Sequence, residues 1–291
     1  MFLRAWRHPV TRGNRFGAMA RYLSWKVSAC MSPGPAVIPF VNDTFLLGEP
    51  DTHEARQLRL LTLIDFEAMA FVAHFLRPDE YLVDVGASIG SYAVLAAAAS
   101  GAYVTAFEPA PARAALLRRN VALNELEGFI DPRECAIGEN VGQRECAVEA
   151  DCGITVPERR PPGQCISVNV TRLDEARLGG RPVLAKIDVA GGELAVLRGA
   201  HATLGWASLC AVIVGSDPRR PAGVAKPHLV QTVMERHGFI PVDYDPLRRC
   251  VTHVGIGLRR KTIYVRARQA EHVSRRLARA SGLWVTEELC I

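Results

Sequence analysis

The sequence predicts an α/β domain with a doubly wound, mostly parallel sheet and an N-terminal helical arm. From residue 81 onward, short apolar runs alternate with segments of helical period. Alternation of this kind is typical of parallel strands joined by helices. Nearly half of the 291 residues are hydrophobic (49%), so the chain can bury a large core. This length fits one large domain with appendages.

The first third of the chain predicts an arm followed by a strand pair. Phe16, Met19, Leu23 and Val27 lie at helical spacing among basic residues, and the Ser-Pro-Gly-Pro stretch at 32–35 ends that helix. Residues 36–48 alternate as a short strand pair with a turn at 42–43, and residues 54–76 predict one helix. We therefore assign residues 1–53 to the arm and strand pair, 54–268 to the main domain and 269–291 to a C-terminal tail helix.

The main domain supplies the remaining predicted elements. Strands are expected at 81–85, 102–107, 183–187, 209–214, 239–242 and 262–265, and helices at 89–99, 111–124, 193–204 and 227–237. The stretch 141–172 lacks a helical period and contains three prolines, so we interpret it as an insertion or hairpin.

The net charge of +5 is unevenly distributed, because six basic residues precede the first acidic residue, Asp43. A basic arm can contact anionic headgroups or nucleic acid, and solvated helix faces are the alternative. Trp6, Tyr22 and Trp25 could stack on bases, but they suit equally an anchor to the domain or to a membrane interface. We expect no nucleic-acid partner, and we keep a weak peripheral membrane contact as a hypothesis. The pattern says nothing of the oligomeric state.

The eight cysteines include no C-x-x-C pair and no nearby histidine pair at ligand spacing, which argues against a metal site. Arg4 follows Met1–Leu3 directly and no apolar segment of signal-peptide type comes next, so we expect no signal peptide. The longest apolar run, residues 93–99, is too short to span a bilayer. We therefore expect free thiols and a cytoplasmic, or membrane-peripheral, location.

The corner that predicts chemistry lies after the first strand of the main domain. Asp84, Gly86, Ser88 and Gly90 follow that strand, and the next strand ends at Glu108, 22 residues after Gly86. Ligands of doubly wound sheets bind at the carboxyl ends of strands, and an acid about 20 residues after the glycine turn binds ribose hydroxyls. The glycines are expected to let the backbone approach a ligand closely.

Two ligands use such a corner. A dinucleotide needs G-x-G-x-x-G, but Ser88 replaces its second glycine, and Asp84 would repel the pyrophosphate by a few kcal/mol, roughly. S-adenosylmethionine has no phosphate and carries positive charge at its methionine end, so Asp84 favours it. The alternative is that Asp84 only caps the following helix.

The wider chain strengthens this interpretation. The segments LVDVGASIGSYAVLAA, VTAFEPAPARAALLRRNVALNEL and VLAKIDVAGGELAVLRGAHATL resemble the FkbM-type family of S-adenosylmethionine-dependent methyltransferases. The resemblance implies a Rossmann-like methyltransferase fold and methylation of a hydroxyl on a small molecule or sugar. Carried over by position, it assigns cofactor binding to Asp84, Gly86, Ala87, Ser88, Gly90, Glu108, Pro109, Ala136, Ile137 and Asp188, with support from Asp65, Lys186 and Glu193.

Several positions depart from the family pattern. Members usually carry Glu at Ala190, Asn at Ser88, a carboxylate at the strand end of Gly215 and Ser216, an Asn-His pair at Cys152 and Gly153, and Asn at Lys261. Three hypotheses therefore stand: an active O-methyltransferase, a catalytically degenerate S-adenosylmethionine-binding sensor or scaffold, and a nicotinamide-dependent (NAD) oxidoreductase, which Asp84 and Ser88 disfavour.

Asp188 is the candidate catalytic residue, either as a general base or as a cofactor-orienting acid. Lys186 precedes it by two residues, so both side chains are expected on one face of the strand, where an ion pair between them would keep Asp188 a weak base. Acceptor specificity is expected to lie in residues 141–172 and 217–228.

Overall fold

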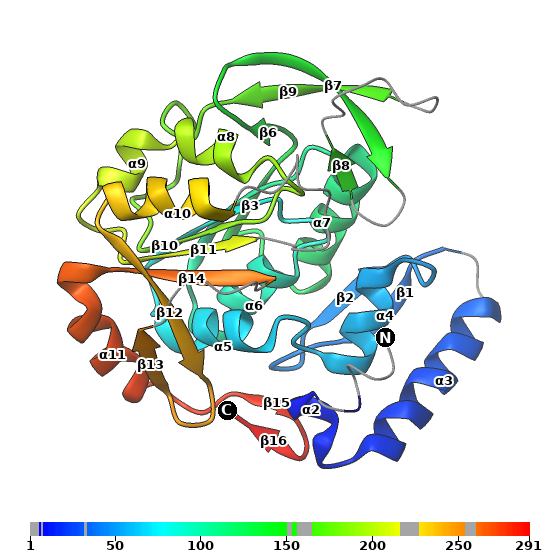
Figure 1. Cartoon of the computed structure of the whole chain (residues 1–291). Helices are drawn as coiled ribbons and strands as arrows, with labels where there is room; N and C mark the ends of the chain where they lie inside the picture. Colours follow the sequence, from blue (N-terminus) through cyan, green and yellow to red (C-terminus); the bar gives the residue numbers. More distant parts are fainter. Residues whose placement is uncertain are drawn as a thin grey trace.

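The computed structural model describes residues 6, 8–31, 34–149, 153–155, 165–215, 227–253 and 260–291. In this part of the chain, a central eight-stranded sheet carries helices on both faces, and the N-terminal helices lie at the periphery (Figure 1). None of the helices in these ranges combines the length and the apolar character that crossing a membrane requires.

The helices and strands follow one another in a regular order. The helices are α2 (Pro9–Arg12), α3 (Arg15–Met31), α4 (His53–Leu61), α5 (Phe66–Phe75), α6 (Ser91–Ser100), α7 (Pro111–Leu123), α8 (Glu193–Arg198), α9 (His201–Gly205), α10 (Pro227–Arg236), η1 (Ala267–Gln269) and α11 (Ala270–Ala278). The strands are β1 (Ala36–Pro39), β2 (Phe45–Gly48), β3 (Tyr81–Val85), β4 (Tyr103–Phe107), β5 (Ile130–Arg133), β6 (Ala136–Ile137), β7 (Gly142–Glu149), β8 (Gly153–Thr155), β9 (Cys165–Thr171), β10 (Leu184–Ile187), β11 (Ala211–Gly215), β12 (Phe239–Asp245), β13 (Cys250–His253), β14 (Lys261–Arg266), β15 (Trp284–Thr286) and β16 (Leu289–Cys290).

The central sheet has the order β13-β12-β14-β11-β10-β3-β4-β5. The five strands from β11 to β5 pair in parallel, whereas β14 is antiparallel to both of its neighbours. The chain proceeds from β3 to β5 in one direction and from β10 to β11 in the other. The strand order therefore reverses between β3 and β10, and this is where doubly wound sheets bind ligands.

Alternation along the strands explains the two layers of helices. Leu82, Leu184 and Ile213 belong to a core shared with α5, α6 and α7. The next residues along the same strands, such as Val83 and Ala185, belong to a second core with α8, α9 and α10. Successive strand side chains point to opposite faces, so the sheet is apolar on both sides, as the predicted doubly wound fold requires.

Two predicted helices are each divided in the structure. The predicted helix 54–76 is α4 and α5, because Thr62 adopts a positive φ of 55° and ends α4, and α5 restarts after Asp65. The predicted helix 193–204 is α8 and α9, separated at Gly199, where the backbone oxygen of Gly138 lies so near that a Cβ would be 1.9 Å from it. The predicted tail helix over residues 269–291 is wrong beyond residue 278, because α11 ends there and the β15–β16 hairpin follows.

The arm and the strand pair pack on the main domain. Tyr22 and Trp25 of α3 are buried in the first core, and the Trp25 indole N–H donates a hydrogen bond to the Val37 oxygen at 3.0 Å. The Asn120 side chain on α7 bonds both backbone groups of Leu47 in β2. Residues 142–149 and 165–171 form an antiparallel pair within a second sheet of order β6-β9-β7-β8.

Candidate functional site

The loop between β3 and α6 turns on three positive φ angles, at Gly86 (79°), Ser88 (54°) and Gly90 (95°). A Cβ on Gly86 would lie 2.1 Å from the backbone oxygen of Asp188, and a Cβ on Gly90 would lie 2.5 Å from Leu117 Cδ1. Packing within the protein therefore requires both glycines. Their predicted contact with a cofactor remains a prediction.

Glu108 is buried at the carboxyl end of β4. Its Oε2 accepts a hydrogen bond from the Ser88 N–H at 2.8 Å, and its Oε1 accepts one from the Ala110 N–H at 2.9 Å. Burial raises the pKa of the Glu108 carboxyl, and these hydrogen bonds together with the charge of Arg113 act against that rise. Because a carboxylate oxygen can accept more than one hydrogen bond, both oxygens retain capacity for ribose hydroxyls.

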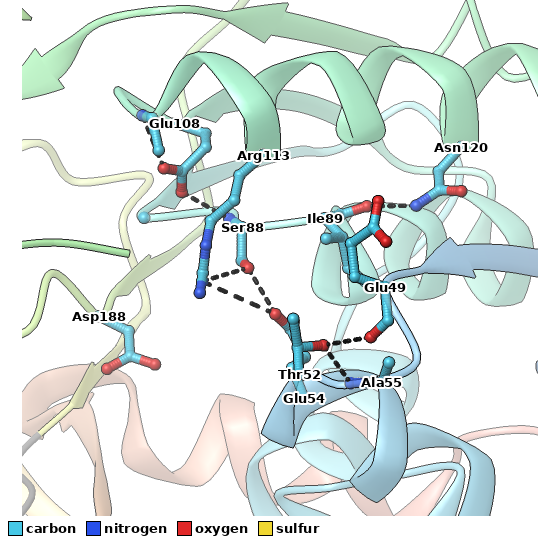
Figure 2. Close-up of polar contacts among 12 residues, drawn as sticks. Glu49, Thr52, Glu54, Ala55, Ser88, Ile89, Glu108, Arg113, Asn120 and Asp188 are labelled. Carbon is cyan, nitrogen blue, oxygen red and sulfur yellow. Dashed lines mark hydrogen bonds and ion pairs between the residues drawn. The ribbon is translucent and has the colours of Figure 1, made fainter. Parts of the chain in front are cut away.

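A polar cluster that the sequence did not predict surrounds Ser88 (Figure 2). The Ser88 hydroxyl donates to Glu54 Oε2 at 2.5 Å and accepts a hydrogen bond from Arg113 Nη1 at 2.9 Å. The Arg113 guanidinium also lies 3.9 Å from the Glu54 carboxylate. Burial raises the pKa of Glu54, against the opposing charge of Arg113. We refer to Glu54, Ser88, Glu108 and Arg113 as the Glu108 side of the site.

Part of this cluster could have been found from sequence. Arg113 lies in the first turn of the helix that follows Glu108, a position that faces the same sheet edge. Glu54 comes from α4, 34 residues before Ser88, and no local pattern connects the two.

Asp84 and Lys186 form a buried ion pair. The parallel register of β3 and β10 sets the two residues opposite each other, and Lys186 Nζ lies 2.9 Å from Asp84 Oδ1. Lys186 also donates to the Gly86 oxygen at 2.5 Å. The sequence predicted an ion pair of Lys186 with Asp188, whereas the register of the strands places Asp84 opposite Lys186. Lys186 also offsets the charge of Asp84, so Asp84 argues less strongly against a pyrophosphate than the sequence suggested.

Lys261 pairs with two other carboxylates. Its Nζ contacts Asp188 Oδ2 and lies 3.2 Å from Asp65 Oδ2, and the Tyr92 hydroxyl donates to Asp65 at 3.3 Å. Burial disfavours the charge on Lys261, but the fields of Asp188 and Asp65 outweigh it and raise the lysine's pKa. Burial, followed by the charges of Asp65 and Asp188, raises the pKa of Tyr92 well above its ordinary value. Tyr92 is therefore a neutral hydrogen-bond donor at neutral pH.

Gly215 makes the position of Asp188 possible. Gly215 and Lys261 are direct partners in the antiparallel pairing of β11 and β14. A Cβ on Gly215 would lie 2.1 Å from Asp188 Oδ1, so the carboxylate of Asp188 occupies the space that a side chain would fill. The departures at Gly215 and Lys261 are thus coupled, since one vacates the space and the other supplies the counter-charge. We refer to Asp65, Asp188, Gly215 and Lys261 as the Asp188 side.

The other predicted site residues lie near this edge of the sheet in different roles. Ile137 packs with Phe107 in the second core, and Ala136, in β6, packs on the small core of the second sheet. Glu193 is buried with a pKa raised by burial, and it accepts a hydrogen bond from the Gly191 N–H at 3.0 Å. Ala190 has a positive φ of 59°. Ala87 is buried and Pro109 half-buried. Cys152, Ser216 and residues 217–226 lie outside the described residues.

These residues fit S-adenosylmethionine. Three carboxylates (Asp65, Asp84, Asp188) face two ammonium groups (Lys186, Lys261), which leaves one negative charge beside the strand ends. Asp84 Oδ2 is buried and has no hydrogen-bond partner among the described residues. A ligand with a ribose at one end and net positive charge at the other complements Glu108 and this cluster.

Comparisons with known proteins agree. A family model described as "Methyltransferase FkbM domain" matches residues 84–253, more than half of the chain. The 31-O-demethyl-FK506 methyltransferase FkbM of Streptomyces tacrolimicus is 38% identical over 77 residues, which is 26% of this chain and only 29% of that protein.

Solved structures give a more distant likeness. A geranyl diphosphate C-methyltransferase from Streptomyces coelicolor A3(2) matches 77% of this chain and 80% of its own, at 14% identity and a TM-score of 0.41. A SAM-dependent O-methyltransferase from Thermotoga maritima matches 68% of this chain and 64% of its own, at 11% identity and a TM-score of 0.39. Likenesses at this level carry no argument about activity.

Proposed function

The chain belongs to the FkbM methyltransferase family, and we propose that it methylates a hydroxyl oxygen on a small molecule or sugar. Family membership makes the fold Rossmann-like and the cofactor S-adenosylmethionine, and it displaces the NAD-dependent oxidoreductase that the sequence had left as an alternative. When bound, S-adenosylmethionine supplies an electrophilic methyl group on a positively charged sulfur.

On the Glu108 side, the chain's own residues bind and orient the nucleoside. Backbone N–H groups of Ser88 and Ala110 fix the Glu108 carboxylate at the end of β4, where it would accept hydrogen bonds from ribose hydroxyls. Arg113 and Glu54 fix the Ser88 hydroxyl through two hydrogen bonds. Orientation of this kind brings reacting atoms together, which supplies much of the rate enhancement of a displacement reaction.

One observation carries the proposal for the acceptor: Asp188 is the accessible carboxylate. Its side chain is 40% exposed, whereas Asp84 and Lys186 are almost fully buried. Its Oδ2 contacts Lys261, and its Oδ1 lies over Gly215. We assign to Asp188 the role of accepting the proton that the acceptor hydroxyl releases as its oxygen is methylated.

An Asp188→Asn variant tests this role in a tritiated-methyl transfer assay against sugars and hydroxylated metabolites. The expected loss of transfer is about 10²–10⁴-fold, larger than any loss of affinity for S-adenosylhomocysteine. Transfer at the parent rate would remove Asp188 from the reaction.

The second candidate is a sensor or scaffold that binds S-adenosylmethionine without turnover. It is favoured by the Lys261–Asp188 ion pair, which holds the proposed base, and by the lack of a carboxylate at Ala190 and Gly215. Binding of S-adenosylhomocysteine together with no transfer to any acceptor of the panel would support it over the enzyme.

We further propose a cytoplasmic location, because six cysteines of the described ranges are free thiols and free thiols persist in reducing compartments. Cell fractionation of the full chain tests the location. We also propose that the segments 141–172 and 217–228 determine which acceptor is methylated. Exchanging them with those of a relative of known acceptor tests this proposal.

A further inference from the structure

Helix α3 has two apolar faces, and only one of them packs on the domain. Tyr22 and Trp25 point into the core. On the opposite side, Phe16, Leu23, Val27 and Met31 are 82%, 53%, 62% and 81% exposed. Their spacing of seven, four and four residues places them in one line along the helix. We refer to these four residues as the α3 stripe.

The α3 stripe differs from scattered surface hydrophobics. It extends over about 22 Å at 1.5 Å per residue, along a helix that lies at the outer edge of the molecule (Figure 1). Trp6 prolongs it at one end, with its ring edge-on to Phe16 at a centroid distance of 6.1 Å. A continuous exposed apolar line of this kind marks an interaction surface.

The charges around the stripe identify the partner. Arg12, Arg15, Arg21 and Lys26 lie on or beside α3, and no acidic residue occurs before Asp43. Arg59 of α4 adds a further cation, and burial together with the charge of Arg21 lowers its pKa. Glu288, an acid from the C-terminal hairpin, bonds Asn14 before the start of α3. The surface therefore combines a line of apolar side chains with positive charge on its flanks.

We propose that the α3 stripe docks on the surface of an anionic phospholipid bilayer, with α3 lying in the plane of the headgroups. Aromatic and aliphatic side chains would enter the boundary of the acyl chains while the basic residues meet anionic headgroups, as in interfacial amphipathic helices. This contact is independent of the identity of the methyl acceptor.

Other occupants fit the surface less well. A second copy of this chain would bring two arms of like charge together, which opposes association. A nucleic acid would pair with the cations and could stack on Phe16 and Trp6 at one end, but it would leave the aliphatic Leu23, Val27 and Met31 in water. An anionic bilayer satisfies both the apolar line and the positive charge.

Co-sedimentation of the full chain with vesicles tests the proposal. Phosphatidylcholine vesicles with and without phosphatidylserine are compared at low and high salt. A Leu23→Gln/Val27→Gln variant removes half of the stripe, and a Val141→Gln/Leu247→Gln variant changes two equally exposed aliphatic residues outside α3. The thermal shift with S-adenosylhomocysteine checks that each variant is folded.

We expect salt-sensitive binding that requires phosphatidylserine. The stripe variant should bind at least tenfold more weakly, and the control variant as the parent does. Absence of binding, or equal binding by the parent and the stripe variant, would overturn the proposal. A concentration-dependent dimer that the stripe variant abolishes would also overturn it, because a second copy would then cover the stripe.

Discussion

The two sides of the site hold their carboxylates by different means. On the Glu108 side, backbone N–H groups of a tightly packed loop fix the acid. On the Asp188 side, one lysine side chain serves two aspartates, and a missing side chain at Gly215 makes the space. Backbone donors survive most substitutions nearby, whereas a side-chain arrangement changes with a single residue. Under the proposed roles, recognition of the nucleoside would depend on the fold, and acceptor chemistry would depend on exchangeable side chains.

The largest expected effect comes from Gly86, where the two sides touch. Gly86→Ala would set a Cβ 2.1 Å from the Asp188 oxygen at a positive φ. We expect the free energy of unfolding to fall by about 3 kcal/mol, from backbone strain and overpacking together. Urea unfolding measures it. Gly205→Ala, where no atom lies within 4 Å of the new Cβ, is the control and should leave stability nearly unchanged. Parent stability in Gly86→Ala would show that the loop relaxes easily.

The next largest effect is expected from a substitution that removes the ion pairs of the Asp188 side alone. Lys261→Met leaves Asp65 and Asp188 without their shared counter-charge, and we expect a loss of about 3 kcal/mol in unfolding free energy. The matched control is Arg275→Met, which breaks the exposed Arg275–Glu271 pair (3.3 Å) and should cost less than about 1 kcal/mol.

Adding Asp65→Asn to Lys261→Met should restore part of that stability, because it removes one of the two uncompensated charges. Chemical unfolding of the single and double variants measures this coupling. Purely additive losses would mean that Lys261 does not act through its ion pairs.

The Glu108 side is tested by cofactor affinity. Glu108→Gln retains the size of the side chain but removes the charge that ribose hydroxyls would donate to. We expect affinity for S-adenosylhomocysteine to fall roughly 10–100-fold, because a hydrogen bond to a charged group contributes about 1.5–3 kcal/mol. Glu54→Gln should change the affinity much less, because Glu54 contacts the loop through the Ser88 hydroxyl. Calorimetry that ranks the two variants in the opposite order would move the ribose contact to Glu54.

The smallest effect concerns the helix that supports the Asp188 side. α5 begins after Asp65 and holds His74 near its other end, hydrogen-bonded to the Tyr244 hydroxyl at 2.5 Å. Burial lowers the pKa of His74 from 6.5 to about 4. The fold therefore favours neutral His74, and this contribution is present above pH 6.5 and lost as the pH falls from 6.5 towards 4.

At pH 5 the expected loss from His74 is about 2 kcal/mol. His74→Gln should remove most of this difference between pH 7 and pH 5 in urea unfolding. An unchanged pH dependence would assign the acid sensitivity to other groups.

Much of the fold could be predicted, because its strands are continuous apolar runs bounded by glycine and charged residues. Residues 81–85 and 239–242 lie in β3 and β12, as expected. The divisions at Thr62 and Gly199 could not be predicted, since a positive φ and a close backbone approach depend on segments far away in the sequence.

The arrangement of the candidate site was predictable where its residues lie in one loop and at one strand end, as for Gly86, Ser88 and Glu108. It was not predictable where it depends on register. The Lys186–Asp84 pair follows from the alignment of β10 with β3, and the Lys261–Asp188 pair from that of β14 with β11. Residue spacing gives the face of a side chain but not its neighbour on the next strand.

Thermal unfolding of the full chain with S-adenosylhomocysteine, and in parallel with NAD, tests whether the Glu108 side binds S-adenosylmethionine. A ligand at 100 times its Kd stabilises the folded state by about 2.7 kcal/mol. We predict that saturating S-adenosylhomocysteine raises the Tm of the parent protein, does so much less in Glu108→Gln, and that NAD raises neither. A Tm that S-adenosylhomocysteine leaves unchanged, or that NAD raises instead, would rule out an S-adenosylmethionine site.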